Sequence, residues 1–292
     1  MATIPRKYVE PPTRQPLPYS LVSMAEWRDV TDPHVLAGME WQSLCGNSAT
    51  ALDYCVTGAP LPATKVDTGG RDMRGANPFT VYAEVDCSPV GTHWDKGVAD
   101  ARRLLEQSEA HEVERAFWTG TAAGVTNTVY PRLAANSDVY DTSSTFRVQL
   151  QAAAVVVTGS TGVTPALGMG ALEDAAEDCY HGVVTIHVPI IAIASLMHRG
   201  IIQRDGSRLR TIAGNTVIAG AGYSNTSPTG AAAGVGQAWL YATGQVFGYR
   251  GAIKSFVREQ SFERSTNTLK AIAERTYVLG YECCLHAVLI NI

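Results

Sequence analysis

The chain has 292 residues, 46% of them hydrophobic, and a formal net charge of -4. A chain of this length and composition buries roughly three quarters of its unfolded surface, which excludes disorder of the whole chain. The acidic balance argues against a protein that holds nucleic acid by neutralising its phosphates, because such domains usually carry a basic face.

The N-terminal quarter of the chain is poor in regular patterns. Five prolines among polar residues in 1–24 favour an extended arm. A short helical or irregular piece is expected over 27–54. The next segment, 58–77, is rich in Gly, Pro, Thr and charge, which predicts an exposed excursion or a long, loose hairpin. Loops of this length in compact domains tend to be functional or disordered.

A short apolar strand, 78–85, leads into a long helix, 95–119. Apolar and small residues recur along this helix at spacings of three and four, so one face should contact a core. These residues are Val98, Ala101, Leu105, Ser108, Val113, Ala116 and Phe117. Charged residues, Glu109 among them, should face elsewhere and form helical ion pairs such as Arg102 with Glu106. At about 1.5 Å per residue the helix spans roughly 37 Å, nearly twice the usual length.

The remaining three fifths of the chain alternate between strand and helix patterns. We expect strands over 146–151, 183–188 and 215–221, helices over 165–180 and 190–198, and a flexible surface loop over 220–236. Pro189 suits the start of the second of these helices. The final segments, 239–249 and 271–290, are rich in β-branched, aromatic and alternating residues and should form paired sheet.

The cysteines and the longest apolar segment indicate in which cellular compartment the protein is found. Six cysteines occur without a CxxC pair, at Cys45, Cys55, Cys87, Cys179, Cys283 and Cys284. We expect free thiols in a reducing cytoplasm, with the adjacent Cys283 and Cys284 pointing to opposite faces of a strand. No signal-peptide pattern begins the chain, and the longest apolar segment, 183–197, is too short to span a bilayer. We therefore expect a soluble protein, made and used inside a cell, with no membrane partner.

No pattern predicts a reaction centre. The chain has no GxxxxGK[ST], GxSxG or HExxH motif, and its seven histidines never fall at i, i+4. The loop at Gly220 lacks a third glycine and a following helix, so it predicts nucleotide binding only weakly. The glutamates of the long helix are better explained as a solvated surface than as a metal site. His187 is better explained as a hydrogen-bonded core residue than as a ligand. We expect no catalytic residues, no metal and no cofactor.

The charged stretch 250–275 mixes both signs. It fits either a solvated sheet surface or a complementary interface between subunits, in which interspersed charges fix register and partner. The candidate subunit contacts from the whole chain are Lys65, Arg71, Arg74, Arg102, Glu106, Arg258, Glu259, Glu263 and Arg264.

The order of these elements resembles the major capsid proteins of tailed bacteriophages with the Hong Kong 97 fold. The resemblance covers nearly the whole chain: a loose arm, a Gly- and Pro-rich excursion, the strand 78–85, the long helix ending at 114–120, a smaller α/β segment and terminal strands. The segments 258–260, 273–277 and 287–290 are similar to the last strands of that fold. Bacterial encapsulin shells share these features.

The resemblance implies an α+β, Hong Kong 97-type fold in several parts. These are an N-terminal arm (1–48), an extended loop (49–77), a peripheral domain with a spine helix (78–179, helix 95–119), an axial domain (180–236) and a C-terminal sheet of the peripheral domain (237–292). The arm and the extended loop would lie along neighbouring subunits. The axial loops would meet at five-fold and local six-fold axes.

The function that the resemblance implies is structural and not enzymatic. A phage major capsid protein assembles as hexamers and pentamers into an icosahedral head that encloses double-stranded DNA without sequence-specific binding. The implied location is the virion, after assembly in the bacterial host cytoplasm, and the further partners are portal, scaffolding and decoration proteins. Two alternatives stay open: an encapsulin-like compartment shell and, more distantly, an α/β enzyme that uses the Gly220 loop for a small molecule.

One chemical property within this family is autocatalytic cross-linking between a lysine and an asparagine of different subunits. Lys65 lies in the excursion where such a lysine could lie. The position expected for the asparagine, just after Lys270, is Ala271, and the nearby Asn267 is a poor substitute. We therefore expect contacts between subunits to be non-covalent.

Overall fold

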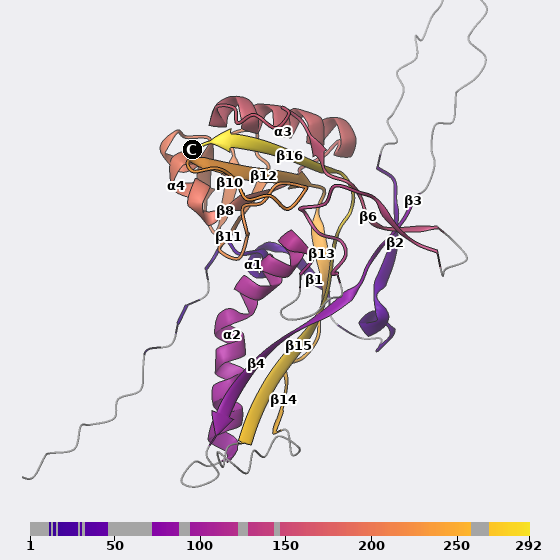
Figure 1. Ribbon diagram of the computed structural model, residues 1–292, viewed down its shortest axis with the longest axis vertical. Helices are drawn as coiled ribbons and strands as arrows, with labels where there is room; N and C mark the ends of the chain where they lie inside the picture. Colours follow the sequence, from indigo (N-terminus) through magenta and orange to yellow (C-terminus); the bar gives the residue numbers. More distant parts are fainter. Residues whose placement is uncertain are drawn as a thin grey trace, which may run out of the picture.

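A long five-stranded sheet with a helix along it forms one end of the molecule (Figure 1). The computed structural model describes residues 12, 14–15, 17–28, 30, 33–45, 72–87, 94–121, 128–142, 147–257 and 269–292. The strands of this sheet are β1 (Glu26–Arg28), β4 (Pro78–Cys87), β13 (Val246–Arg250), β14 (Lys254–Val257) and β15 (Leu269–Tyr281). β4 and β15 pair antiparallel from Cys87 opposite Leu269 to Pro78 opposite Val278.

Helix α2 (Trp94–Thr119) lies along β4 and β15 (Figure 1). Leu105, Val113 and Phe117 are almost fully buried in the core that α2 shares with these strands, so the predicted helix and its apolar face are confirmed. The prediction was wrong for two neighbouring residues of this helix, Ser108 and Glu109. Ser108 is only half-buried and Glu109 is buried, because the stripe continues at a spacing of four and the sheet supplies Glu109 with polar partners.

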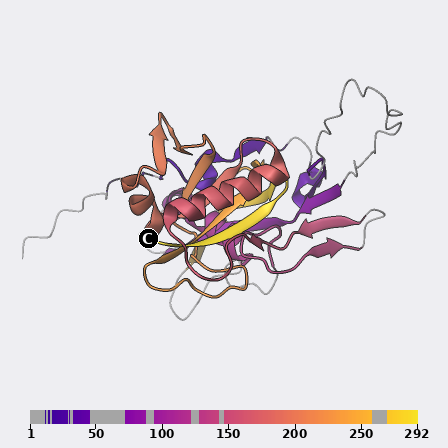
Figure 2. The ribbon, with the colours of Figure 1, turned by 90° about the horizontal axis from the view of Figure 1, so that it is seen from above.

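A seven-stranded sheet forms the other end of the molecule (Figure 1). In spatial order its strands are β7 (Val155–Val156), β16 (Leu285–Asn291), β12 (Gln237–Thr243), β8 (Thr185–Pro189), β11 (Thr216–Gly220), β10 (Arg208–Thr211) and β9 (Ile202–Asp205). Helix α3 (Pro165–Tyr180) packs across β16 and β12, and Figure 2 shows it lying over the sheet. Helix α4 (Ile190–His198) follows β8, with Pro189 at its N-cap as predicted.

The close approach of α3 to β16 yields a direct test. A Cβ at Gly168 would overlap the Ile290 Cγ2 atom, whereas a Cβ at Gly170 would meet nothing within 4 Å. We predict that Gly168→Ala lowers the free energy of unfolding by about 1–3 kcal/mol because it overpacks this contact. Gly170→Ala, the matched control on the same helix, should raise it by about 0.5–1 kcal/mol because alanine favours the helix. Equal effects in urea unfolding would contradict this packing.

A four-stranded sheet in the order β2-β3-β6-β5 projects to one side of the molecule (Figure 1). Its strands are β2 (Met39–Ser43), β3 (Asp72–Ala76), β6 (Val148–Gln151) and β5 (Val139–Asp141). A short helix α1 (Leu21–Met24) and a 3-10 helix η1 (Pro33–Ala37) precede β2. The expectation of a helical or irregular piece over 27–54 was therefore incomplete. β1 and β2 are too short for a periodic signal, and their pairing partners, β13 and β3, lie far away in sequence.

The C-terminal segment divides between two sheets. The sequence predicts paired sheet over 239–249 and 271–290, and strands β12, β13, β15 and β16 confirm this. The resemblance implies a single peripheral sheet over 237–292, whereas β12 pairs with both β16 and β8 in the seven-stranded sheet. β13, β14 and β15 belong to the five-stranded sheet. The strand pattern is local, whereas the choice of sheet depends on long-range pairing.

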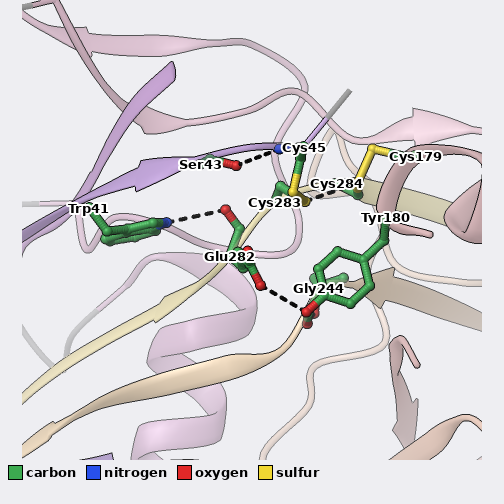
Figure 3. Close-up of a disulfide and its surroundings, with 10 residues drawn as sticks. Trp41, Ser43, Cys45, Cys179, Tyr180, Gly244, Glu282, Cys283 and Cys284 are labelled. Carbon is green, nitrogen blue, oxygen red and sulfur yellow. Dashed lines mark hydrogen bonds between the residues drawn. A yellow bond between two sulfur atoms is a disulfide. The ribbon is translucent and has the colours of Figure 1, made fainter. Parts of the chain in front are cut away.

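Two disulfides join parts of the chain that are distant in sequence. Cys45 is bonded to Cys283, and Cys179 to Cys284 (Figure 3). The expectation of free thiols was wrong for these four residues, because folding brings together cysteines separated by 238 and 105 positions. Cys283 and Cys284 lie in the turn between β15 and β16, and Cys284 has a positive φ of 59°. They are therefore not on opposite faces of one strand.

Within the described ranges, no helix is both long enough and apolar enough to cross a bilayer.

Candidate assembly surface

The exposed face of α2 carries charges of both signs. Arg102 Nε lies 3.1 Å from Glu106 Oε1, with the two side chains 58% and 49% exposed, which confirms the predicted helical ion pair. Next to this pair, Arg103 Nη2 lies 2.9 Å from Asp100 Oδ1. Exposed pairs of this kind contribute only about 0.3–0.5 kcal/mol to stability. The exposed face therefore presents acidic and basic side chains close together.

A groove of about 380 Å³ runs between α2 and β4. Tyr82 and Leu104 line it and remain 56% and 38% exposed. Glu112 and Arg115, which form an ion pair with each other, lie in the same lining. An apolar floor with charged residues beside it is the usual anatomy of a protein interface. The groove and the charged face of α2 together form the candidate assembly surface.

Glu109 attaches helix α2 to the sheet beneath it. Its side chain is 11% exposed and accepts two hydrogen bonds from Arg275 Nη1, at 3.0 and 2.8 Å. The Tyr277 hydroxyl donates a third, at 2.6 Å. Both partners belong to β15. A buried carboxylate with this many donors is stable only while its partners stay in place. The contact of Glu109 with Arg275 and Tyr277 therefore fixes the position of α2 on the sheet.

Glu114 joins α2 to two other segments. Its carboxylate accepts hydrogen bonds from the backbone N–H groups of Leu21 in α1 and Gly222 after β11, each at 2.9 Å. Burial raises the pKa of Glu114 above 4.5, and the two N–H donors oppose this shift by favouring the charged form. A Cβ at Gly222 would overlap the His111 carbonyl oxygen, so the loop lies directly on the helix backbone. Glu114 therefore positions α2, α1 and the segment after β11 relative to one another.

His187 is a core residue, as predicted. It is fully buried, with Nδ1 2.8 Å from the Tyr223 hydroxyl and Nε2 3.0 Å from Thr243 Oγ1. Burial lowers its pKa to about 3, so the ring is neutral at physiological pH. Both ring nitrogens have hydroxyl partners, as expected for a hydrogen-bonded core residue.

The structure brings together only part of the predicted contact set. Arg102 and Glu106 lie on the candidate assembly surface. Arg74 lies elsewhere, on β3, where it is half-buried between Trp41 of β2 and Gln149 of β6. Six predicted contacts lie outside the described residues: Lys65, Arg71, Arg258, Glu259, Glu263 and Arg264. The possible cross-linking partner Asn267 lies outside them too, whereas Ala271 is buried on β15.

Glu109 and Glu114 were not identified from the sequence as buried residues, because charged side chains are expected on the exposed face of a helix. Glu109 continues the series Ala101, Leu105, Val113 at a spacing of four, and Glu114 lies three residues before Phe117. A carboxylate in register with an apolar stripe is the signal that could have identified them. The identity of their partners, Arg275 and the N–H of Gly222, required the tertiary structure.

Comparison with known proteins provides a consistent set of structural neighbours. No family model and no curated protein matches the sequence. Among solved structures, the capsid of the native GTA particle is 11% identical, with a TM-score of 0.58 over 99% of this chain and 96% of that chain. The Mycobacterium phage Adephagia structure is 11% identical, with a TM-score of 0.56 over 99% and 94%.

A shell from a different biological setting matches similarly. The SrpI encapsulin complex from Synechococcus elongatus PCC 7942 is 11% identical, with a TM-score of 0.54 over 98% of this chain and 93% of that chain. Identities this low establish the fold alone. With its spine helix, its long β4 and β15 pair and nearly complete coverage in both directions, the chain has the Hong Kong 97-like fold that phage capsids and encapsulin shells share.

Proposed function

We propose that this chain is a major capsid protein that assembles as hexamers and pentamers into the icosahedral head of a bacteriophage. The observation that carries the proposal is the likeness to capsid chains over almost the full length of both partners. In this proposal the protein is located in the virion and has a structural, non-enzymatic role. Double-stranded DNA would be enclosed without sequence-specific contacts, and portal, scaffolding and decoration proteins would be the other partners.

The architecture of the single chain supports a role in assembly. The three sheets extend in different directions from one joint, where β2 and α3 meet the turn between β15 and β16. Much of the surface of each sheet is therefore left for other contacts (Figures 1 and 2). We propose that the five-stranded sheet with α2 is the peripheral domain and the seven-stranded sheet the axial domain. Segments 1–48 and 49–77 would be the arm and the extended loop. Closed symmetry then multiplies modest interfaces into a stable shell, assembled in the host cytoplasm.

The proposed interface on α2 can be tested by exchanging two charges. We predict that the double variant Arg102→Glu with Glu106→Arg keeps the melting temperature of the unassembled subunit, because the helical ion pair is retained in reverse. It should reduce the yield of shells at least tenfold, because the charge pattern presented to a neighbour is inverted. Sedimentation of assembled particles measures the yield.

The matched control keeps the sign of the charge at both positions and changes the side chains that carry it. Arg102→Lys with Glu106→Asp keeps the sign at both positions and should assemble at close to the wild-type yield. Equal shell yields from the inverted and the sign-preserving variants would remove α2 from the proposed interface.

The second candidate function is an encapsulin-like compartment shell, which the match to the SrpI encapsulin favours. The two functions differ in what the particle encloses. Particles from cells that naturally produce this chain would contain nuclease-protected double-stranded DNA of defined length if it is a phage capsid. A stoichiometric enzyme in place of DNA, identified by mass spectrometry of the particle, would support the compartment.

A further inference from the structure

Four cysteines from three elements meet at the joint between the sheets (Figure 3). Cys45 follows β2, Cys179 lies near the end of α3, and Cys283 and Cys284 form the turn between β15 and β16. The two disulfides therefore tie both β2 and α3 to one turn. Cys283 and Cys284 are 0% and 5% exposed, whereas the outer cysteines of each bond, Cys45 and Cys179, are only half-buried.

The two disulfides are close enough to exchange. The Sγ atoms of Cys283 and Cys284 lie 3.3 Å apart although they belong to different disulfides. The Sγ atoms of Cys45, Cys283 and Cys284 all lie within 4.8 Å of one another. Disulfides rearrange when a thiolate attacks a disulfide sulfur and displaces the other sulfur. A thiolate released at Cys283 would thus already lie beside the sulfur of the second disulfide.

We propose that this cluster is a thiol–disulfide exchange site at which one molecule of an external dithiol releases both tethers. A thiolate of the dithiol attacks the half-buried Cys45 sulfur, and Cys283 leaves as a thiolate with the electron pair of the broken bond. The second thiol of the dithiol then displaces Cys45, which takes up a proton, and the dithiol becomes a cyclic disulfide.

The second half of the exchange occurs within the protein. The Cys283 thiolate attacks the Cys284 sulfur, the Cys283–Cys284 bond forms, and Cys179 leaves as a thiolate that takes up the second proton. In total the dithiol loses two electrons and two protons. The protein ends with free thiols at Cys45 and Cys179 and one disulfide between the adjacent residues. β2 and α3 are both released by a single two-electron reduction.

Non-covalent contacts at the same turn remain after this release. The Trp41 indole N–H of β2 donates to the Glu282 carbonyl oxygen at 3.2 Å, and the Tyr180 hydroxyl of α3 donates to the Glu282 carboxylate at 2.8 Å (Figure 3). Burial and the neighbouring Glu282 raise the pKa of Tyr180 to about 12, so this donor stays protonated at neutral pH. Exchange would therefore convert two covalent tethers into hydrogen-bonded contacts without requiring the joint to unfold.

The experiment maps thiols after limited reduction. The oxidised full-length protein is treated with half an equivalent of dithiothreitol per chain, quenched in acid, labelled with N-ethylmaleimide at low pH and digested for mass spectrometry. We expect labels on Cys45 and Cys179 in a ratio close to one, with Cys283 and Cys284 joined in one peptide. Labels on Cys283 or Cys284, with or without the outer cysteines, would overturn the proposal, as would an oxidised protein without the two disulfides.

A variant provides the matched control. In Cys179→Ser with Cys284→Ser the first disulfide remains but the exchange partner is gone, so the same treatment should label Cys45 and Cys283 equally. The wild-type mapping decides the proposal even if this variant folds poorly. Because the readout is the bonding pattern of the single chain, the proposal stands or falls independently of the proposed shell function.

Discussion

Replacing Arg275 by methionine is expected to lower the free energy of unfolding of the unassembled subunit by about 3–5 kcal/mol. The substitution leaves the Glu109 carboxylate buried between α2 and β15 without the two hydrogen bonds from Arg275 Nη1, and only the Tyr277 hydroxyl still donates to it. An uncompensated buried charge is among the few mechanisms that cost this much. Urea denaturation followed by circular dichroism measures the loss.

Two further variants separate charge from packing. Glu109→Leu combined with Arg275→Met removes both charges and should recover part of the lost stability, because apolar residues of similar volume can replace a buried ion pair. The remaining loss comes from the buried Tyr277 hydroxyl, which no longer has Glu109 as its acceptor. The exposed variant Arg102→Ala should change stability by less than about 0.5 kcal/mol. If Arg275→Met cost no more than Arg102→Ala, the buried pair would not be what fixes the spine helix to the sheet.

Replacing Glu114 by alanine is expected to lower the free energy of unfolding by about 2–6 kcal/mol, the cost of two unsatisfied buried donors. The backbone N–H groups of Leu21 and Gly222 both donate to this carboxylate and would be left buried without an acceptor. Each unsatisfied buried donor costs about 1–3 kcal/mol. Glu114→Gln should lie between alanine and wild type, since its amide oxygen can accept one N–H while its NH2 group faces the other.

The pH dependence of stability provides a second measurement for Glu114. Because burial raises its pKa in the folded chain, the stability that this group contributes is fully present below pH 4.5, the ordinary value, and is lost as the pH rises through the raised pKa. The stability advantage of the wild type over Glu114→Gln should therefore shrink from pH 4.5 towards pH 7. An advantage that grows over this range would mean that the two N–H donors outweigh burial.

Elements with a long, regular pattern could be predicted from the sequence. The helices α2, α3 and α4 and the strands β4, β8 and β11 lie close to where their periodicity and their Gly and Pro signals indicate. These signals are local, and each spans enough residues to stand out from neighbouring segments. The order of the elements was sufficient to predict the fold class, and the structural neighbours support that prediction.

Features that depend on contacts between distant segments could not be predicted in the same way. Cys45 and Cys283 carry no local sign of pairing, and only the fold brings them together. The burial of Glu109 depends on Arg275, which lies in a strand that pairs with β4 and β14. Of the candidate assembly surface, the exposed helix charges followed from helical spacing, whereas the groove beside them exists only because β4 packs against α2.

The mass and form of the purified wild-type assembly test the central claim most directly. Light scattering after size-exclusion chromatography, followed by electron microscopy of the same fraction, should detect closed icosahedral shells built from hexamers and pentamers. In a reconstruction, α2 should lie in the shell wall with its charged face against a neighbouring subunit. A stable species of one to four chains, with no shells under conditions that favour assembly, would contradict the proposal that this chain is a capsid protein.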